Sequence, residues 1–341
     1  MLIGFQVTNV PRQQRRLERL AQNGIRQANV LVHDDNRASL EQLRPHLATA
    51  ESAPILSTLI DALPVRTPVN VAKVRQLSPF RYPGGKTWLV PVAREWLRLL
   101  ETPACFLEPF AGGGIISLTA VAENLVDHAI MVEKDDDVAA VWAVLIDGSD
   151  HDVETLVARI LGFNVTFDNV RSVLNSSPAT TVDRAFSTIV KNRCNRGGIL
   201  APGAGLTKTG ENGRGLNSRW YPETLAKRFV AIRQIRHRIT FIHGDAFDLL
   251  TTRDFFSAPC FVDPPYTAGG KRAGTRLYKH NDVNHERLFD LIASRPAPAL
   301  MTYDDTDTAR DLANKHGFQL DHVAMKSTHN VVMKELTIFK S

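Results

Sequence analysis

A glycine-rich segment and a later acid form the first group of residues that could do chemistry. The run FLEPFAGGG, residues 106–114, stands where a buried strand is predicted to give way to a helix beginning near Ile115. Glycines there let the backbone approach a ligand closely, and the helix N-terminus offers free N–H groups. Glu133 follows the next predicted strand, nineteen residues after Gly114, where a carboxylate can accept hydrogen bonds from ribose hydroxyls. The pattern predicts a cofactor that contains a nucleoside; a tight turn with a surface acid is the alternative.

The tetrapeptide Asp263-Pro264-Pro265-Tyr266 is the second such group. It directly follows the apolar run 260–262, which places a carboxylate, a stiff backbone and an aromatic ring at the carboxyl end of a predicted strand. Ligands bind at that end in open α/β sheets. The two prolines lack N–H donors, so the carbonyls of Asp263 and Pro264 cannot be consumed in a regular ladder and are left to accept from a ligand. A loop that ends in a packed tyrosine is the alternative.

Short apolar runs that could position these groups recur along the chain. Each is followed by polar or glycine-rich turns and a helical stretch, and this alternation predicts a doubly wound α/β sheet. A long stretch between the second and third runs, residues 149–238, lacks the alternation and is predicted to be an insertion. The runs are 105–107, 129–132, 239–242, 260–262 and 299–301.

The first 76 residues are predicted to form a separate N-terminal extension of unknown role. A helix is expected over about 11–22 and another after Asn36, and two prolines within 62–68 indicate a linker. Arg12, Arg15, Arg16 and Arg19 could touch nucleic acid, although a solvated helix face is the simpler interpretation.

Composition is that of an ordinary soluble globular protein, with 341 residues, 43% of them apolar and 23% charged. No apolar run approaches the roughly 18 residues that a membrane span needs, and the N-terminus does not resemble a secretory signal. The three cysteines, Cys105, Cys194 and Cys260, are far apart, which excludes a disulfide framework or a thiolate zinc cluster. We therefore expect a cytoplasmic protein that contacts no membrane.

Positive charge is concentrated in one window. The net charge is +5, but residues 191–240 hold eleven Lys or Arg against two acids, Glu211 and Glu223, so that this window alone carries +9. Such a window favours a polyanionic partner. A cationic surface that balances the acidic remainder of the chain is the alternative.

Four blocks together resemble a known family. The segments RYPGGK (81–86) and EPFAGGG, the acid Glu133 and the DPPY tetrapeptide occur in the order seen in the alpha group of the Dam-like, D12 class DNA N6-adenine methyltransferases. The resemblance spans about residues 78–341. It extends to KNRCNRGG (191–198), which is similar to the target-recognition stretch of the family, and to Lys334–Ile338, which is similar to its closing strand.

The resemblance implies a fold and a division into domains. The fold is a Rossmann-like class I S-adenosylmethionine-dependent methyltransferase fold with an inserted, mostly helical target-recognition domain. The catalytic domain would comprise residues 77–148 and 239–341, and the DNA-binding insertion residues 149–238. The insertion lacks the Phe-Asn-Val-Pro-type segment of relatives that recognise GATC, so the recognition sequence stays open.

The resemblance also implies roles for individual residues. Asp263 and Pro264 match the acceptors of the target amino group, and Tyr266 matches the ring on which the target base stacks. No metal is required. The positions expected to bind S-adenosylmethionine are Tyr82, Lys86, Phe110, Gly112, Gly114, Glu133, Asp245 and Asp263, with Phe247 near the cofactor's adenine. The positions expected to contact DNA are Arg81, Arg193, Asn195, Arg196, Arg214, Asn217 and Arg219.

The expected activity is methyl transfer from S-adenosylmethionine to N6 of an adenine flipped out of double-stranded DNA. Three alternatives remain open: an enzyme that methylates cytosine N4 or RNA, a silent DNA-binding protein of the same fold, and a nicotinamide oxidoreductase. The last leaves the DPPY segment and the basic window unexplained. A bacterial, archaeal or phage origin is expected, and a companion restriction or defence component and the oligomeric state are left open.

Overall fold

The structure is a computed structural model, and it describes residues 42, 74–81, 85–210, 213–265, 282–326 and 332–341, with the backbone alone for 324–326 and 332–334. The chain divides into two compact units, residues 1–65 and 66–341. Apart from Gln42, every described residue belongs to the second unit. The predicted N-terminal helices, Tyr82 and Tyr266 therefore lie outside the described residues.

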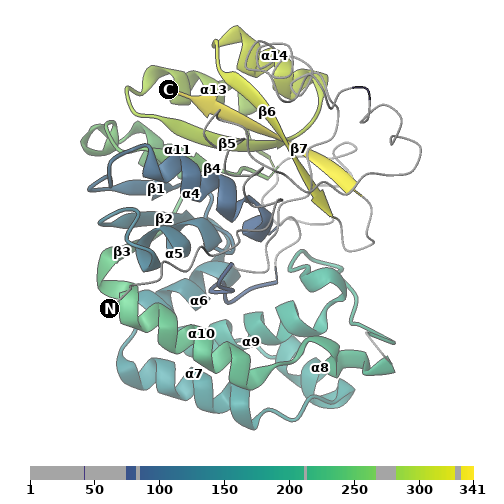
Figure 1. The fold of residues 1–341 in the computed structure, drawn as a ribbon. Helices are drawn as coiled ribbons and strands as arrows, with labels where there is room; N and C mark the ends of the chain where they lie inside the picture. The colour runs from purple at the N-terminus through teal and green to yellow at the C-terminus, as the bar shows by residue number, and fades with distance from the viewer. Residues whose placement is uncertain (1–41, 43–73, 82–84, 211–212, 266–281, 327–331) are drawn as a thin grey trace, which may run out of the picture. The chain divides into compact units, whose positions relative to one another are not determined.

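A seven-stranded mixed sheet forms the centre of the second unit (Figure 1). Its order is β3-β2-β1-β4-β5-β7-β6, with β1 to β5 parallel and β7 antiparallel to both neighbours. The order reverses between β1 and β4, as at the switch point of a doubly wound sheet. The predicted Rossmann-like α/β class is confirmed. The strands are β1 (Phe106–Glu108), β2 (Ala129–Glu133), β3 (Ile239–His243), β4 (Cys260–Val262), β5 (Ala299–Asp304), β6 (Gln319–Lys326) and β7 (Val332–Lys340).

Alternate residues of the central strands enter two separate cores. Phe106, Met131 and Phe261 pack into one cluster, whereas their neighbours Leu107 and Cys260 pack into the other. Successive side chains of a strand point to opposite faces. A strand covered on both faces must be apolar throughout, which explains the short continuous apolar runs in the sequence.

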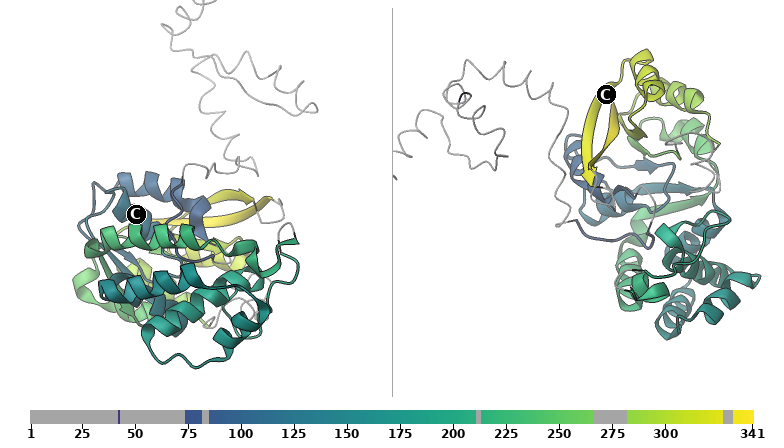
Figure 2. Two further views of the ribbon diagram at one scale, coloured as in Figure 1. Left: turned by 90° about the horizontal axis from the view of Figure 1, so that it is seen from below. Right: turned by 90° about the vertical axis from the view of Figure 1, so that its right-hand side faces the viewer.

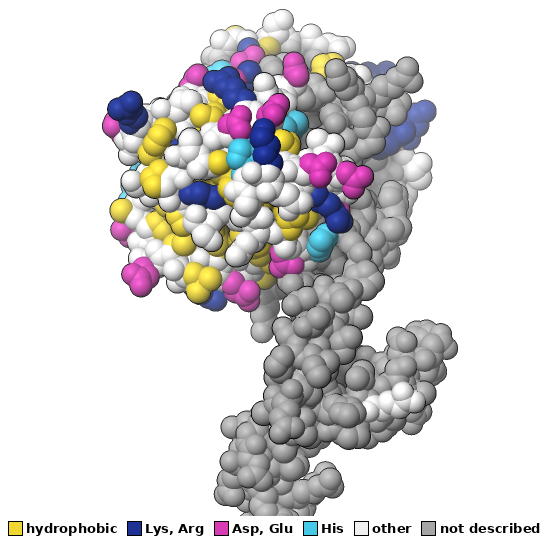
Figure 3. Space-filling model, turned by 90° about the horizontal axis from the view of Figure 1, so that it is seen from above, with side chains coloured by type: hydrophobic (Ala, Val, Ile, Leu, Met, Phe, Trp, Pro, Cys, Tyr) yellow, Lys and Arg dark blue, Asp and Glu magenta, His cyan; other side chains and the backbone are white. Residues whose placement is uncertain are grey.

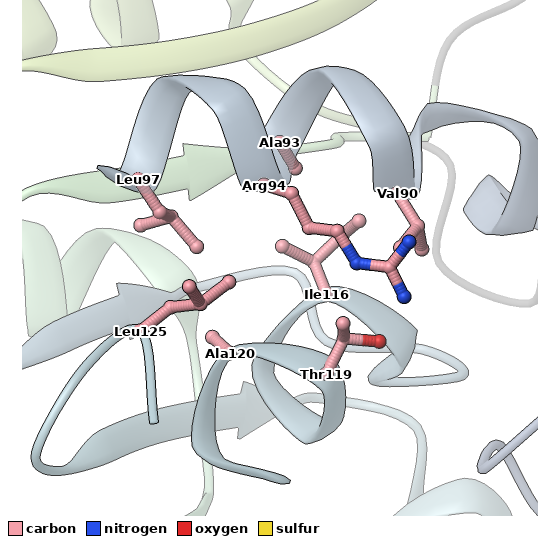
Figure 4. Close-up of a pocket in the computed structure, with 8 residues that line it drawn as sticks. All are labelled: Val90, Ala93, Arg94, Leu97, Ile116, Thr119, Ala120 and Leu125. Carbon is pink, nitrogen blue, oxygen red and sulfur yellow. The ribbon is translucent and has the colours of Figure 1, made fainter. Parts of the chain in front are cut away.

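Helices cover both faces of the sheet. The first face carries η4 (Lys86–Leu89), α4 (Val90–Arg98), α5 (Ile115–Ala122) and α6 (Asp136–Ile146); the second carries α11 (Ala246–Thr251), α13 (His285–Ser294) and α14 (Asp307–Lys315), with η9 (Arg253–Phe255) after α11. Figure 4 shows how α4 packs over α5 through the apolar side chains Val90, Ala93, Leu97, Ile116 and Ala120.

The predicted insertion is helical and lies beyond β3, at the opposite end of the sheet from β6 (Figures 1 and 2). Ser149 and Thr180 each start a helix with a reciprocal capping box, in which Asp152 and Asp183 respectively return the bond. This satisfies otherwise orphaned N–H groups. The insertion comprises α7 (Asp150–Gly162), α8 (Phe167–Asn175), α9 (Thr181–Cys194), η5 (Arg196–Gly198), η7 (Gly215–Arg219), α10 (Pro222–Ile235) and η8 (Arg236–Arg238).

Within the described residues, no helix has the length and apolar character needed to cross a membrane.

Candidate active site

The carboxyl ends of the five parallel strands bring the predicted groups to one edge of the sheet. Leu107 of β1 pairs with Cys260 of β4, so the glycine turn after β1 and the Asp263 segment after β4 leave neighbouring strands at the same edge. Burial raises the pKa of Glu108, the last residue of β1, and the nearby charge of Asp263 adds to the effect. Both segments therefore border one region at the switch point of the sheet, where α/β proteins bind ligands.

The glycine turn is tightly constrained. Gly112 and Gly114 have φ of 47° and 58°, a region that residues with a side chain rarely adopt. A Cβ on Gly114 would lie 2.6 Å from Met131 Cε and 2.9 Å from Trp142 Cζ2. The indole Nε1 of Trp142 also donates to the carbonyl of Gly112 at 2.9 Å. The turn thus needs glycine at position 114 and presents its backbone at the start of α5.

Glu133 fastens this turn to β2. Its Oε2 accepts the N–H of Gly112 at 3.0 Å, and its Oε1 accepts those of Lys134 and Asp135 at 2.8 Å each. Burial raises the pKa of the Glu133 carboxyl to about 7, although these bonds favour its charged form. Since Oε2 receives one donor and Oε1 two, Oε2 has an acceptor position left for a ribose hydroxyl. Its contact with ribose stays a prediction.

Asp245 lies after β3, on the same edge as Glu133. It caps α11 by accepting the N–H of Phe247 at 2.9 Å, and it accepts Lys134 Nζ at 2.7 Å. Against the opposing effect of burial, these bonds lower the pKa of Asp245. The pair of Lys134 and Asp245 places a charge of each sign where the cofactor's adenine is expected. Phe110, half-buried, follows β1 at this edge.

Glu108 is a residue that the sequence reasoning missed. Only 3% of it is exposed, and its carboxylate accepts the N–H of Ser117 at 2.8 Å. Burial raises the pKa of Glu108 to about 8, and the nearby charge of Asp263 adds to the effect. An acid within an otherwise apolar strand, in the segment FLE, was the available signal, because a buried carboxyl is costly and is retained for a reason.

Asp263 is held by two donors on a single oxygen. Thr302 Oγ1 donates to Asp263 Oδ1 at 2.8 Å, and Lys86 Nζ lies 3.0 Å from the same oxygen. The ammonium of Lys86 also lies 3.5 Å from Glu335 Oε1. The resemblance assigned Lys86 to the carboxylate of the cofactor, whereas the structure shows its ammonium between two carboxylates of the protein.

The chemistry of this edge fits S-adenosylmethionine. The carboxylates of this edge outnumber the ammonium groups of Lys86 and Lys134, and Asp304 Oδ2 is buried without a hydrogen-bond partner. A surplus of acids suits a ligand with a sulfonium and an ammonium, while Glu133 and the glycine turn suit its ribose. The acids of the edge are Glu108, Glu133, Asp245, Asp263, Asp304 and Glu335.

The residues predicted to contact DNA divide into buried and exposed ones. Arg193 and Asn195 are 5% and 2% exposed, and they donate to the carbonyls of Pro79 and Ile199. Their side chains therefore hold the protein's own backbone and offer no open surface, so we no longer count these two among the candidates for direct DNA contact. Burial, together with the neighbouring arginines, lowers the pKa of Arg193 to about 9.

The remaining DNA candidates lie on or near the surface. Arg196, Arg214 and Asn217 are exposed, while Arg81 and Arg219 are half-buried. Arg214 lies over the ring of Tyr221, with 5.8 Å from its Cζ to the ring centroid. These residues stay predictions for DNA contact.

Comparison with known proteins gives one family and several distant structures. The model of the D12 class N6 adenine-specific DNA methyltransferase family matches residues 82–328. No curated protein matches the chain significantly.

The solved structures that resemble the chain are distant from it. A precorrin-6y C5,15-methyltransferase from Geobacter metallireducens is 11% identical, with a TM-score of 0.32 over 79% of this chain and 89% of that one. A SAM-dependent methyltransferase from Agrobacterium tumefaciens is 8% identical, with a TM-score of 0.36 over 75% and 61%. An rRNA methyltransferase from Streptomyces viridochromogenes is 12% identical, with a TM-score of 0.34 over 75% and 85%.

Proposed function

Because the chain belongs to the D12 class N6 adenine-specific DNA methyltransferase family, it is a methyltransferase, and we propose that it methylates N6 of an adenine flipped out of double-stranded DNA. The observation that carries the proposal is the position of Asp263, beside the glycine turn and across the switch point of the sheet. The methyl donor we propose is S-adenosylmethionine, which when bound supplies an activated methyl group on a sulfonium.

The backbone and acids at the strand ends would hold the cofactor. The glycine turn, with Gly112 and Gly114 in left-handed conformations, lets the main chain lie close to the ligand. Glu133 would accept from ribose hydroxyls, and Asp245 would lie near the cofactor's adenine. Glu108 ends β1 at the same edge, and we propose that its buried carboxyl accepts from the ammonium of the methionine moiety.

Asp263 and Pro264 would prepare the target nitrogen. The lone pair of adenine N6 is delocalised into the ring, so this nitrogen is a poor nucleophile. If its two N–H groups donate to Asp263 Oδ2 and to the carbonyl of Pro264, the nitrogen is drawn toward a tetrahedral shape and its lone pair is directed at the methyl group. The N–C bond would then form in line as the S–C bond breaks, and the proton that N6 loses would pass to Asp263 Oδ2, to which it is hydrogen-bonded. Positioning of this kind is worth up to roughly 7–11 kcal/mol.

An adenine inside a duplex cannot reach Asp263, so the base must leave the stack at a cost of about a few kcal/mol. Stacking on an aromatic ring returns roughly 1–3 kcal/mol, and Tyr266, outside the described residues, is the ring predicted for this. Exposed basic residues such as Arg196 and Arg214 would supply phosphate contacts.

Incubation of the protein with DNA and labelled S-adenosylmethionine, followed by mass spectrometry of the nucleosides, tests the proposal. The expected product is N6-methyladenine, and single-molecule sequencing of the same DNA would give its sequence context. N4-methylcytosine or a labelled RNA as the only product would overturn the adenine assignment. DNA binding with no labelled product would identify a silent DNA-binding protein.

Substitution of Asp263 tests the proposal at the level of a single residue. Asp263→Ala is expected to abolish methyl transfer, because the main acceptor for N6 is lost, while cofactor binding measured by calorimetry is largely kept. Full activity in this variant would contradict the role of Asp263.

A further inference from the structure

The two oxygens of the Asp263 carboxylate are held unequally, and this matters for the reaction. Thr302 Oγ1 and Lys86 Nζ both meet Oδ1, at 2.8 Å and 3.0 Å. A carboxylate whose one oxygen is held by two fixed donors cannot rotate freely. Its other oxygen, Oδ2, is the one that these residues leave for a ligand.

The donors themselves are fixed by the sheet and by Glu335. Thr302 is fully buried in β5, between the core residues Met301 and Tyr303. Lys86 and Glu335 are 5% and 4% exposed, and Glu335 holds the ammonium from β7 at 3.5 Å. Glu335 is also the register partner of Asp304 at the end of β5. Asp263 is thus tied to β5 directly and to β7 through Lys86.

A buried lysine needs a compensating charge if it is to stay charged. Asp263 alone could provide it, but the ion pair would then draw the carboxylate toward the ammonium and weaken it as an acceptor for substrate. Glu335 shares the ammonium, so that Lys86 orients Asp263 without neutralising it completely. Glu335 therefore gives β7 a part in orienting Asp263, although β5 lies between β7 and the strand that precedes Asp263.

We propose that Thr302 and Glu335 are positioning residues for methyl transfer, which act through Asp263 Oδ1 and Lys86 so that Oδ2 faces the target amino group. Neither residue touches the substrate. The inference rests on the proposed function, since it concerns how that reaction is aligned. Its consequence is kinetic: loss of either residue lowers kcat, while binding of the cofactor and of DNA is kept.

The first test removes the hydroxyl of Thr302 with almost no change in volume. Thr302→Val is expected to lower kcat about 10- to 100-fold, as misplacement of a reacting group does, with KM for DNA and the cofactor dissociation constant unchanged. Thr302→Ser keeps a hydroxyl and is expected to restore most of kcat. The rescue separates a positioning role from a purely structural one.

Thr337→Val is the matched control. Thr337 is the register partner of Thr302 on β7, is equally buried, and donates to the carbonyl of Asp321 at 3.1 Å. The same substitution there removes a buried hydroxyl that does not reach Asp263, so kcat should stay at the wild-type level. An equal loss of kcat in Thr337→Val and Thr302→Val would overturn the proposal.

Glu335→Gln tests the second arm. It should lower kcat by a similar factor, and the double variant Thr302→Val/Glu335→Gln should lose less than the product of the two single losses, because both residues act on one carboxylate. Wild-type kcat in either single variant, or strictly independent effects of the two substitutions on kcat, would overturn the proposal.

Failure of the wild-type protein to methylate its substrate would instead overturn the proposed function. Failure of the positioning role and failure of the proposed function are therefore distinguishable. Unfolding of each variant in urea identifies any variant that fails to fold. If Thr302→Val is one of them, the kcat of Thr302→Ser decides instead.

Discussion

Two carboxyls at the ends of neighbouring strands show how differently buried acids are compensated. Burial raises the pKa of both, to about 7 for Glu133 and about 8 for Glu108. Glu133 receives three backbone N–H groups, whereas the backbone bond to Glu108 comes from Ser117 alone. Hydrogen bonds to the charged form oppose the effect of burial at both residues.

The raised pKa of Glu108 has a measurable effect on stability. In the unfolded chain this carboxyl has its usual pKa of 4.5, whereas in the folded protein burial raises the pKa to about 8. Between these values the folded state binds the extra proton, so stability falls as pH rises from about 4.5 to 8. The difference between these two pKa values corresponds to about 5 kcal/mol. Glu108→Gln removes the ionisable carboxyl. Urea unfolding from pH 5 to 8 should therefore show a smaller decline in the free energy of unfolding for the variant than for the wild type. A constant difference between variant and wild type would contradict the shift.

At the scale of elements, apolar runs predicted the central strands well because those strands are covered on both faces. The run 260–262 coincides with β4, and 129–132 lies within β2. The apolar-run criterion failed for β6, in which the polar residues Gln319, Asp321 and His322 interrupt the apolar ones. β6 is one of the two terminal strands of the sheet, and an edge strand with a solvated face does not need a continuous apolar run.

The candidate site was predictable only where its residues are consecutive in the sequence. The glycine turn and the Asp263 segment are local patterns, and each is placed by the strand that precedes it. The contact of Lys86 with Glu335 joins η4 to β7, and only the pairing of β7 with β5 brings them together. No spacing in the sequence encodes such a contact, which is why Lys86 was assigned to the cofactor alone.

The junction of β1 and α5 gives a prediction about an element boundary. Gly114→Ala places a Cβ at a φ of 58°, within 2.6 Å of Met131 Cε. The left-handed conformation alone costs about 1–2 kcal/mol, and the clash with a packed core adds about 1–3 kcal/mol. Urea unfolding should report the sum, and cofactor binding should weaken because the turn must shift.

Gly162→Ala is the matched control for this substitution. Gly162 ends α7, and a Cβ there meets nothing within 4 Å. The change should be neutral or stabilise the protein by about 0.5–1 kcal/mol. Equal effects at the two glycines would show that the turn after β1 is not constrained as described.

At the scale of the whole second unit, the arrangement of charge is more specific than its total. The face over α13 and α14 carries acidic and basic side chains side by side (Figure 3), including the pairs Lys315 with Glu286 and Arg310 with Asp305. Such mixed charge presents no field of one sign to a polyanion. The basic window lies at the other end of the sheet, in the insertion.

Several arginines of the basic window are hydrogen-bonded to backbone carbonyls of the protein itself. Arg233 donates to the carbonyls of Leu145 and Gly148, and Arg238 donates to those of Val121 and Asp127. These guanidiniums satisfy carbonyls at helix ends and in loops, where a cation is favoured. The +9 of the window therefore overstates the charge that is free to meet DNA. The exposed basic residues in it are Arg196, Lys208, Arg214, Lys227 and Arg236.

The division of the basic window into exposed and structural arginines predicts different outcomes for two substitutions that each remove one positive charge. Arg196→Met removes an exposed guanidinium, and if it contacts a phosphate, the slope of log affinity for DNA against log salt should become shallower by about 0.9. The stability of this variant in urea should hardly change.

Arg238→Met leaves several carbonyls without their donor, so it should cost about 1–3 kcal/mol of stability and leave the salt slope as in wild type. DNA titrations at several salt concentrations would measure both slopes. If Arg238→Met flattens the slope as much as Arg196→Met does, the division between structural and DNA-facing arginines is wrong, and the whole window acts on DNA through its total charge.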